Sequence, residues 1–299
     1  MIRISRDHIV YSLDKTHPPV TTVDPGTAIC FETWDARTGT VQKETDLLTA
    51  PHPKGPNPAT GPVAVRGAAP GDALVVQIQD IKLASRGYTG IRPRQGVLGH
   101  LIDEYRTKIM DIVDGMVVFN ERIRFPIRPM VGVIGTAPAG EGVGTLHPGP
   151  HGGNMDHNDV RIGACVHLPV FVPGGLLALG DVHASMGDGE VSITALEICG
   201  EVRARVDLVK AEGITRPWIE FTDCWIATGD GPTIADAIRV ACEEMAKLLQ
   251  RHLGLSVDDA YLLLSIRGDV RVSQCADPAA VAATARVVMP KCGNGGGGR

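Results

Sequence analysis

Apolar and polar positions alternate over short runs in the first two thirds of the chain, which is the period-two pattern of β-strands. The runs are separated by turn-forming glycine and proline residues. They predict strands at residues 27–33, 73–81, 117–119, 123–127, 131–134, 166–172, 190–198 and 201–209. The stretch 135–153 is rich in glycine and proline and is expected to be a loop.

The period of the pattern changes near the carboxyl end. Residues 233–253 carry apolar side chains three or four positions apart, which predicts an amphipathic helix with Gly254 as its carboxyl-terminal cap. Residues 256–264 begin with a serine and an aspartate three positions later, a variant of the capping box, and predict a second helix. Asp277-Pro278 is a candidate start for a third helix.

These patterns together predict an α+β fold: β-rich, mixed, sandwich-like sheets on which helices pack near the carboxyl terminus. The chain has 299 residues, of which 43% are hydrophobic, so it can bury a sizeable core. No internal repeat or linker is evident. Residues 1–292 are therefore expected to form a single domain, and residues 293–299 a flexible glycine-rich tail.

Charge and hydropathy narrow the class of protein. The formal net charge is −5 with both signs mixed along the chain, so no nucleic-acid partner is expected. The longest apolar stretch, residues 165–179, is broken by prolines and glycines and cannot span a membrane. The start of the chain has no apolar run typical of a signal peptide, and the seven cysteines form no CxxC pair. A cytoplasmic location with reduced thiols is the resulting expectation.

Candidate chemistry is concentrated between residues 147 and 190, which hold five of the ten histidines together with several aspartates. Asp181 and His183 are two positions apart, so in an extended segment both side chains point to one face. A carboxylate and an imidazole on one face form part of a zinc site, and Asp156 is the candidate third ligand. The alternative is that these residues are turn aspartates and a hydrogen-bonded histidine.

Two further features lie beside these residues. Glu190 follows a Gly-Asp-Gly turn at the expected start of a strand, where its carboxylate could act as general base toward water. The alternative is a solvated end of a hairpin. Gly152 and Gly153 offer unhindered backbone N–H groups that suit a developing oxyanion, although a simple turn would have the same sequence.

Several motifs in this order resemble the acetamidase/formamidase family. They are the segments 17–19, 31–36, 57–62, 71–74, 152–156, 180–184 and 187–190. The resemblance spans roughly residues 17 to 200 and implies hydrolysis of small aliphatic amides, such as formamide or acetamide, to ammonia and a carboxylate. It also implies homo-oligomers and a bound divalent metal, zinc with calcium as a further candidate. Family motif positions fall on Asn154, Asp156, Asp181, His183, Asp188 and Glu190.

The sequence departs from the family pattern at Met186. Many members have glutamine at this position, directly before the Gly-Asp-Gly-Glu motif. Met186 cannot make the hydrogen bonds of a glutamine side chain, and substrate preference is open at this position.

The leading hypothesis is a hydrolase in which metal-activated water attacks the amide. Asp156, Asp181 and His183 would bind the metal, and Glu190 would accept the proton of the water. Asn154, His157 and Asp188 complete the candidate catalytic set, with His157 a candidate to help protonate the leaving ammonia. Two alternatives remain: a cysteine enzyme that uses the Cys165 thiol, and a non-catalytic metal or small-ligand binding protein on the same scaffold.

Overall fold

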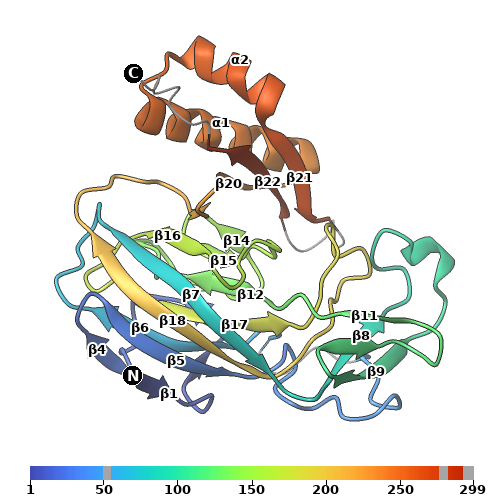
Figure 1. Ribbon diagram of the computed structural model, residues 1–299. Coiled ribbons are helices and arrows are strands. Elements are labelled where there is room, and N and C mark those ends of the chain that lie inside the picture. The colour runs from blue at the N-terminus through green and yellow to red at the C-terminus, as the bar shows by residue number, and fades with distance from the viewer. Residues whose placement is uncertain (50–54, 276–281, 292–299) are drawn as a thin grey trace.

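Two large β-sheets share one hydrophobic core in the computed structural model, which describes residues 1–49, 55–275 and 282–291 (Figure 1). The first sheet has nine strands, in the order β1 (Ile2–Ile4), β5 (Thr27–Thr33), β18 (Gly200–Val209), β7 (Ala73–Leu83), β16 (Cys165–Pro169), β19 (Trp218–Glu220), β20 (Cys224–Gly231), β22 (Ala283–Pro290) and β21 (Asp269–Gln274). The second has seven: β14 (Pro148–Gly149), β15 (Gly152–Asn154), β12 (Met130–Gly135), β17 (Leu177–His183), β6 (Ala59–Val65) and β2 (Ile9–Val10), with β4 (Thr21–Val23) also beside β6.

Two smaller units complete the β-structure. A four-stranded sheet has the order β11 (Arg124–Pro126), β10 (Met116–Val118), β9 (Arg106–Val113) and β8 (Arg86–Ile91). A short pair joins β13 (Val143–Gly144) to β3 (Ser12–Leu13), and η1 (Gly99–Leu101) is a single turn of 3₁₀-helix. The four-stranded sheet lies at one end of the sandwich, beside the end of β17 (Figure 1).

Three adjacent strands of the second sheet determine where the site can form. Every residue of β6, β12 and β17 is buried. A polar side chain on these strands is therefore removed from water, and burying it is unfavourable unless it has a hydrogen-bond partner, an ion or a ligand. β17 pairs antiparallel with both β12 and β6 and therefore lies between these two strands within the sheet.

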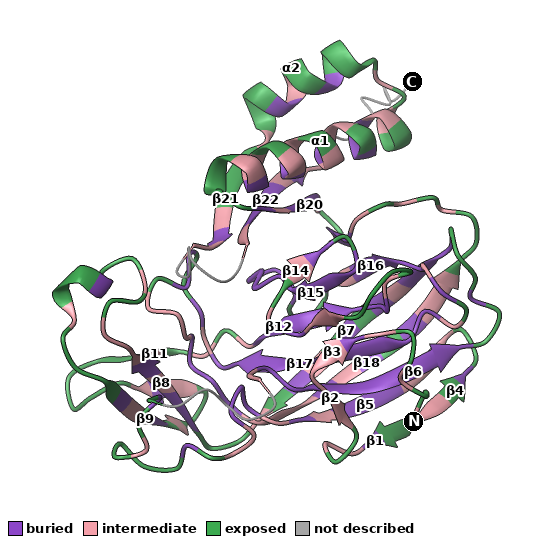
Figure 2. Cartoon of the chain, turned by 180° about the vertical axis from the view of Figure 1, so that it is seen from behind, coloured by how far each residue is buried: buried purple, intermediate pink, exposed green. Residues whose placement is uncertain are grey.

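The two helices pack on the end of the first sheet formed by β20, β22 and β21. They form a second hydrophobic cluster with β20 and β22 (Figure 2). α1 (Ile234–Leu253) begins after Thr233, whose hydroxyl accepts a hydrogen bond from the backbone N–H of Asp236, and ends at Gly254 with φ of 67°. α2 (Val257–Arg267) begins after a capping serine and extends three residues beyond the predicted end. In the part of the chain that the structure describes, neither helix has the length and apolarity needed to cross a membrane.

The predicted fold class is confirmed, and most predicted strands are present with shifted ends. The predicted strand at 190–198 is wrong. Glu190 and Ile193 have φ of 43° and 77°, and the chain makes two consecutive turns there. The predicted loop 135–153 contains β13, β14 and the start of β15. The expected start of a third helix at 277–278 and the tail at 293–299 lie outside the described residues, and residues 283–290 form β22.

Candidate active site

Strand β17 carries two of the predicted ligands into the protein interior. Asp181 and His183 are both buried, and the Nε2 atom of His183 lies 3.6 Å from Oδ1 of Asp181. The two side chains therefore meet, as their spacing in an extended segment predicts. Asp181 itself has φ of 54°, so the strand is irregular at this position.

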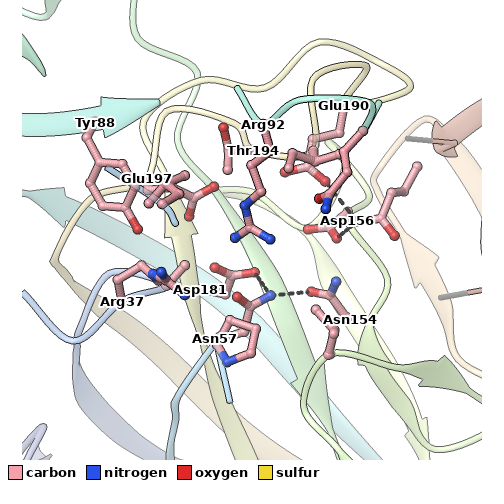
Figure 3. A pocket seen from close by; sticks show the side chains of 17 residues that line it. Arg37, Asn57, Tyr88, Arg92, Asn154, Asp156, Asp181, Glu190, Thr194 and Glu197 are labelled. Atoms are coloured by element: carbon pink, nitrogen blue, oxygen red, sulfur yellow. Dashed lines mark hydrogen bonds between the residues drawn. The ribbon is translucent and has the colours of Figure 1, made fainter. Parts of the chain in front are cut away.

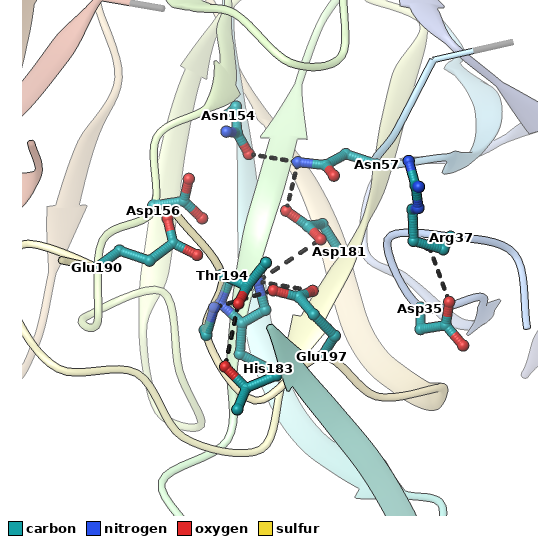
Figure 4. Close-up of polar contacts among 12 residues, drawn as sticks. Asp35, Arg37, Asn57, Asn154, Asp156, Asp181, His183, Glu190, Thr194 and Glu197 are labelled. Carbon is teal, nitrogen blue, oxygen red and sulfur yellow. Dashed lines mark hydrogen bonds and ion pairs between the residues drawn. The ribbon is translucent and has the colours of Figure 1, made fainter. Parts of the chain in front are cut away.

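Glu197 completes this part of the cluster from a segment that the sequence did not single out. Its Oε2 atom lies 3.4 Å from Nε2 of His183, and its backbone bridges to both Tyr88 and His183 (Figure 4). Glu197 is the only charged residue in the apolar run 195–199. Because a buried carboxylate requires a partner, this isolated charge was the sequence signal available for it.

Asp156 and Glu190 approach the same histidine from another side. Asp156 follows β15, and Glu190 lies in the turn that replaces the predicted strand. Nε2 of Gln274, the last residue of β21, donates to Oδ2 of Asp156 at 2.6 Å and to Oε2 of Glu190 at 2.8 Å. One carboxamide thus holds both carboxylates, and nothing in the local sequence around Gln274 indicates this role.

Two asparagines connect the site to the amino-terminal half of the chain. Nδ2 of Asn57 donates to Oδ2 of Asp181 at 2.9 Å and to Oδ1 of Asn154 at 3.3 Å (Figure 4). Asn154 lies at the end of β15 and is buried. The predicted residue Asn154 therefore contacts the cluster through Asn57.

The donor set of this cluster fits a divalent metal ion. Ligand atoms of Asp156, His183 and Glu190 lie within 4.8 Å of one another, and so do those of Asp181, His183 and Glu197. Within the described residues, five buried atoms of this set have no hydrogen-bond partner: Oδ1 of Asp156, Oδ1 of Asp181, Nδ1 and Nε2 of His183, and Oε2 of Glu197. Carboxylate oxygens and imidazole nitrogens are ligands that zinc accepts, and an ion held by either group would satisfy ligand atoms of that group.

Gly132 of β12 keeps the space between the carboxylates open. A Cβ atom at this position would lie 2.6 Å from Oδ1 of Asp156 and 2.9 Å from Oδ2 of Asp181. Any larger residue would push these oxygens apart. The absence of a side chain at Gly132 is therefore a requirement of the cluster.

Burial and mutual repulsion perturb the titration of these groups. Burial, with Glu190 and Asp181 nearby, raises the pKa of Asp156 well above its usual range. Burial and the neighbouring Glu197 raise the pKa of Asp181 to about 6. Burial alone would lower the pKa of His183, but Glu197 and Asp181 more than offset it, so that this pKa is raised. A bound cation would relieve this repulsion.

The cluster opens on a cavity of about 110 Å³, large enough for a few non-hydrogen atoms, since one water occupies about 30 Å³ (Figure 3). Its walls combine four carboxylates and two guanidinium groups with uncharged polar and apolar side chains. The lining residues are Ala36, Arg37, Leu48, Pro56, Asn57, Tyr88, Arg92, Gln95, Leu146, Asn154, Asp156, Asp181, Glu190, Ile193, Thr194, Glu197 and Gln274.

Two predicted catalytic residues do not line this cavity. Oδ1 of Asp188 accepts hydrogen bonds from Asn158 and from the buried Arg286, both at 2.8 Å. Burial alone would raise the pKa of Asp188, but these two contacts lower it, which makes Asp188 a weak base. His157 is buried outside the cavity lining, and burial, with Arg286 nearby, lowers its pKa well below the usual value and favours the neutral imidazole.

Gly152, Gly153 and Met186 also lie outside the cavity lining. The two glycines were predicted to bind an oxyanion, and Met186 is the departure from the family pattern. A Cβ atom at Gly152 would lie 2.3 Å from the carbonyl oxygen of Ile134, and one at Gly153 would lie 2.2 Å from that of His147. Close packing of backbones thus explains both glycines. Met186 is buried in a small apolar cluster with two other side chains.

The fold and the cluster define a β-rich protein with a buried carboxylate–histidine centre at a small polar cavity. The family model of the acetamidase/formamidase family matches residues 11–143 and 139–291, and the chain belongs to this family.

Individual relatives agree with this assignment. The chain is 38% identical to an acetamidase of Bacillus halodurans whose crystal structure superposes with a TM-score of 0.93 over 97% of each chain. It is 28% identical to an acetamidase of Mycolicibacterium smegmatis in an alignment that covers 69% of this chain and 68% of that protein. It is 27% identical to a formamidase of Methylophilus methylotrophus. The alignment with the Methylophilus protein spans about half the length of each chain (50% and 51%).

Proposed function

We propose that this protein hydrolyses the C–N bond of small aliphatic amides, such as formamide and acetamide, to ammonia and a carboxylate, and that it requires a divalent metal. The observation that carries the proposal is the cluster of unpartnered buried ligand atoms around His183, which opens on a cavity of about 110 Å³. Drug-sized ligands occupy pockets of about 300–1,000 Å³, so this volume favours a substrate of a few heavy atoms.

Charge balance supports one divalent ion and an uncharged substrate. Four carboxylates and two guanidinium groups line the cavity, so its formal charge is −2 when His183 is neutral. Such an imbalance is costly in a buried site. One divalent cation neutralises it, and a neutral amide then adds no further charge.

His183 would hold the metal together with carboxylates of the cluster, among which Asp156, Asp181 and Glu197 have the unpartnered oxygens. A metal bound there would act as a Lewis acid on the amide carbonyl and lower the pKa of water, with zinc the first candidate and calcium the second. We further propose that the protein is a homo-oligomer, as the resemblance implies.

Glu190 is the proposed general base. It is buried at the cavity wall, and burial raises the pKa of its carboxyl group. A base works best when its pKa lies near the working pH, so this shift suits the role. The proton that Glu190 takes from water is available for the leaving nitrogen. The carbonyl carbon gains the oxygen of the water, and the C–N bond breaks to give a carboxylate and ammonium.

A panel of amides tests the proposal. We expect ammonia release from formamide and acetamide, and little from benzamide, because the aromatic ring exceeds the cavity of about 110 Å³. The measurement is ammonia release by protein purified with its metal, with Glu190→Gln protein prepared in the same way as the control for contaminating amidases. Bound metal without ammonia release from any amide would contradict hydrolysis and favour a metal- or small-ligand-binding protein.

A further inference from the structure

Tyr88 of β8 carries a hydroxyl group that the protein itself leaves unsatisfied. The side chain is 2% exposed, and within the described part of the chain its hydroxyl oxygen has no hydrogen-bond partner. Leaving a buried polar group unpaired costs about 1–3 kcal/mol. The ring lines the cavity, so a molecule bound in the cavity is the available partner.

The position of this hydroxyl is fixed relative to the carboxylate–histidine cluster. The backbone N–H of Tyr88 donates to the carbonyl of Glu197 at 2.9 Å, and the N–H of Glu197 donates back at 2.8 Å. The ring also packs in an apolar cluster with Val41 and Leu48. Figure 3 shows Tyr88 on the same side of the cavity as Glu197 and Arg37, with its hydroxyl directed inward.

The chemistry of a primary amide determines which of its atoms can receive this hydrogen bond. The nitrogen of an amide donates two hydrogen bonds, and the carbonyl oxygen is the acceptor. The usual pKa of a tyrosine phenol is about 10, so the Tyr88 hydroxyl carries its proton at neutral pH and can donate.

We propose that the Tyr88 hydroxyl donates a hydrogen bond to the carbonyl oxygen of the bound amide and stabilises the negative charge that develops on it. This inference rests on the proposed amide hydrolysis. The oxyanion-binding role then belongs to Tyr88, which lines the cavity. It does not belong to the backbones of Gly152 and Gly153, which lie outside the cavity lining. A donor placed before the reaction needs no reorganisation when charge develops.

The variant Tyr88→Phe tests this proposal, because it removes one oxygen atom and keeps the ring. We expect kcat/KM for acetamide to fall about 10²–10³-fold, the usual effect of losing one oxyanion donor. Metal content should stay at the wild-type level, and the thermal unfolding midpoint of the amide-free protein should not fall, since the lost hydroxyl has no hydrogen-bond partner among the described residues. Tyr261→Phe makes the same chemical change at a residue that is 70% exposed on α2, and it should leave kcat/KM unchanged.

Thioacetamide separates a hydrogen bond to the carbonyl oxygen from a purely structural effect. Sulfur is a weak hydrogen-bond acceptor, so the wild-type enzyme already lacks most of this bond with thioacetamide. Tyr88→Phe should therefore lose much less activity on thioacetamide than on acetamide, measured as disappearance of each substrate.

Equal losses on both substrates, or an unchanged kcat/KM for acetamide, would overturn the role of Tyr88 and leave amide hydrolysis standing. A wild-type protein that hydrolyses no amide would overturn both.

Discussion

Individual side chains hold several buried carboxylates of this site close to one another by hydrogen bonds. Asp156, Asp181 and Glu190 all have raised pKa values because burial disfavours their charged forms. Hydrogen bonds from Asn57 and Gln274 hold one oxygen of each of these groups. For Asp156 and Asp181 the other oxygen has no hydrogen-bond partner among the described residues, which is the arrangement expected of metal ligands.

The variant Glu190→Gln tests the proposal that Glu190 is the general base. Glutamine has nearly the size of glutamate but accepts no proton at neutral pH, so we expect kcat to fall about 10²–10⁴-fold while metal content is retained. Metal analysis and kcat on one preparation decide the outcome. Loss of metal together with activity would make Glu190 a ligand instead of the base, and turnover at the wild-type rate would remove it from the mechanism.

Local spacing makes some residues of the site predictable and hides others. Asp181 and His183 could be found because two positions along a strand bring them to one face. Tyr88 reaches the cluster through its pairing with Glu197, which lies more than 100 residues further along the chain. That pairing leaves no mark in the local sequence. Asp188 lies at a family motif position, but its carboxylate accepts a hydrogen bond from Arg286 of β22 and does not line the cavity.

At the scale of elements, the end of β21 closes the site. Gln274 bridges in parallel to Gly189, so this strand is tied to the turn that carries Glu190. Arg286 of β22 donates to Asp188 in the same turn and to Asp159 at 2.6 Å. The carboxyl-terminal hairpin is therefore part of the site and fixes the position of the proposed base.

Gln274→Leu tests this positioning role. Leucine keeps similar bulk but cannot donate to either Asp156 or Glu190, so both carboxylates lose a fixed hydrogen bond. Loss of such an outer contact typically lowers metal affinity or activity about 10–100-fold. Metal affinity and kcat/KM would be measured beside Gln77→Leu, the same change at an exposed position of β7. Equal behaviour of the two variants would show that Gln274 does not position the carboxylates.

The elements themselves were predictable to different degrees. Helix α1 was found with Gly254 as its carboxyl-terminal cap, because a regular apolar period precedes this glycine; Thr233, predicted as the first helical residue, is its amino-terminal cap. The segment 190–198 was predicted as a strand from its alternation. The positive φ values of Glu190 and Ile193 are strained for side-chain-bearing residues and depend on tertiary contacts.

At the scale of the whole molecule, the site draws on segments from the full length of the chain: Asn57, Tyr88, Asp156, His183 and Gln274. The β-rich class with terminal helices followed from periodicity. The order of strands in the sheets did not follow from periodicity. Strand β5 pairs with β1 and β18, whereas β7 pairs with β18 and β16. Pairing over such separations depends on the packing of the complete core.

The most direct test of the account is metal content and ammonia release measured together on His183→Ala and Asp181→Ala. Both side chains belong to one buried ligand group, so each substitution should lower metal occupancy and acetamide hydrolysis in parallel, by more than the 10–100-fold typical of an outer contact. His147→Ala, at an exposed histidine, should keep both at the wild-type level. Full metal content in both ligand variants, or undiminished ammonia release without metal, would contradict a metal-dependent amide hydrolase centred on His183.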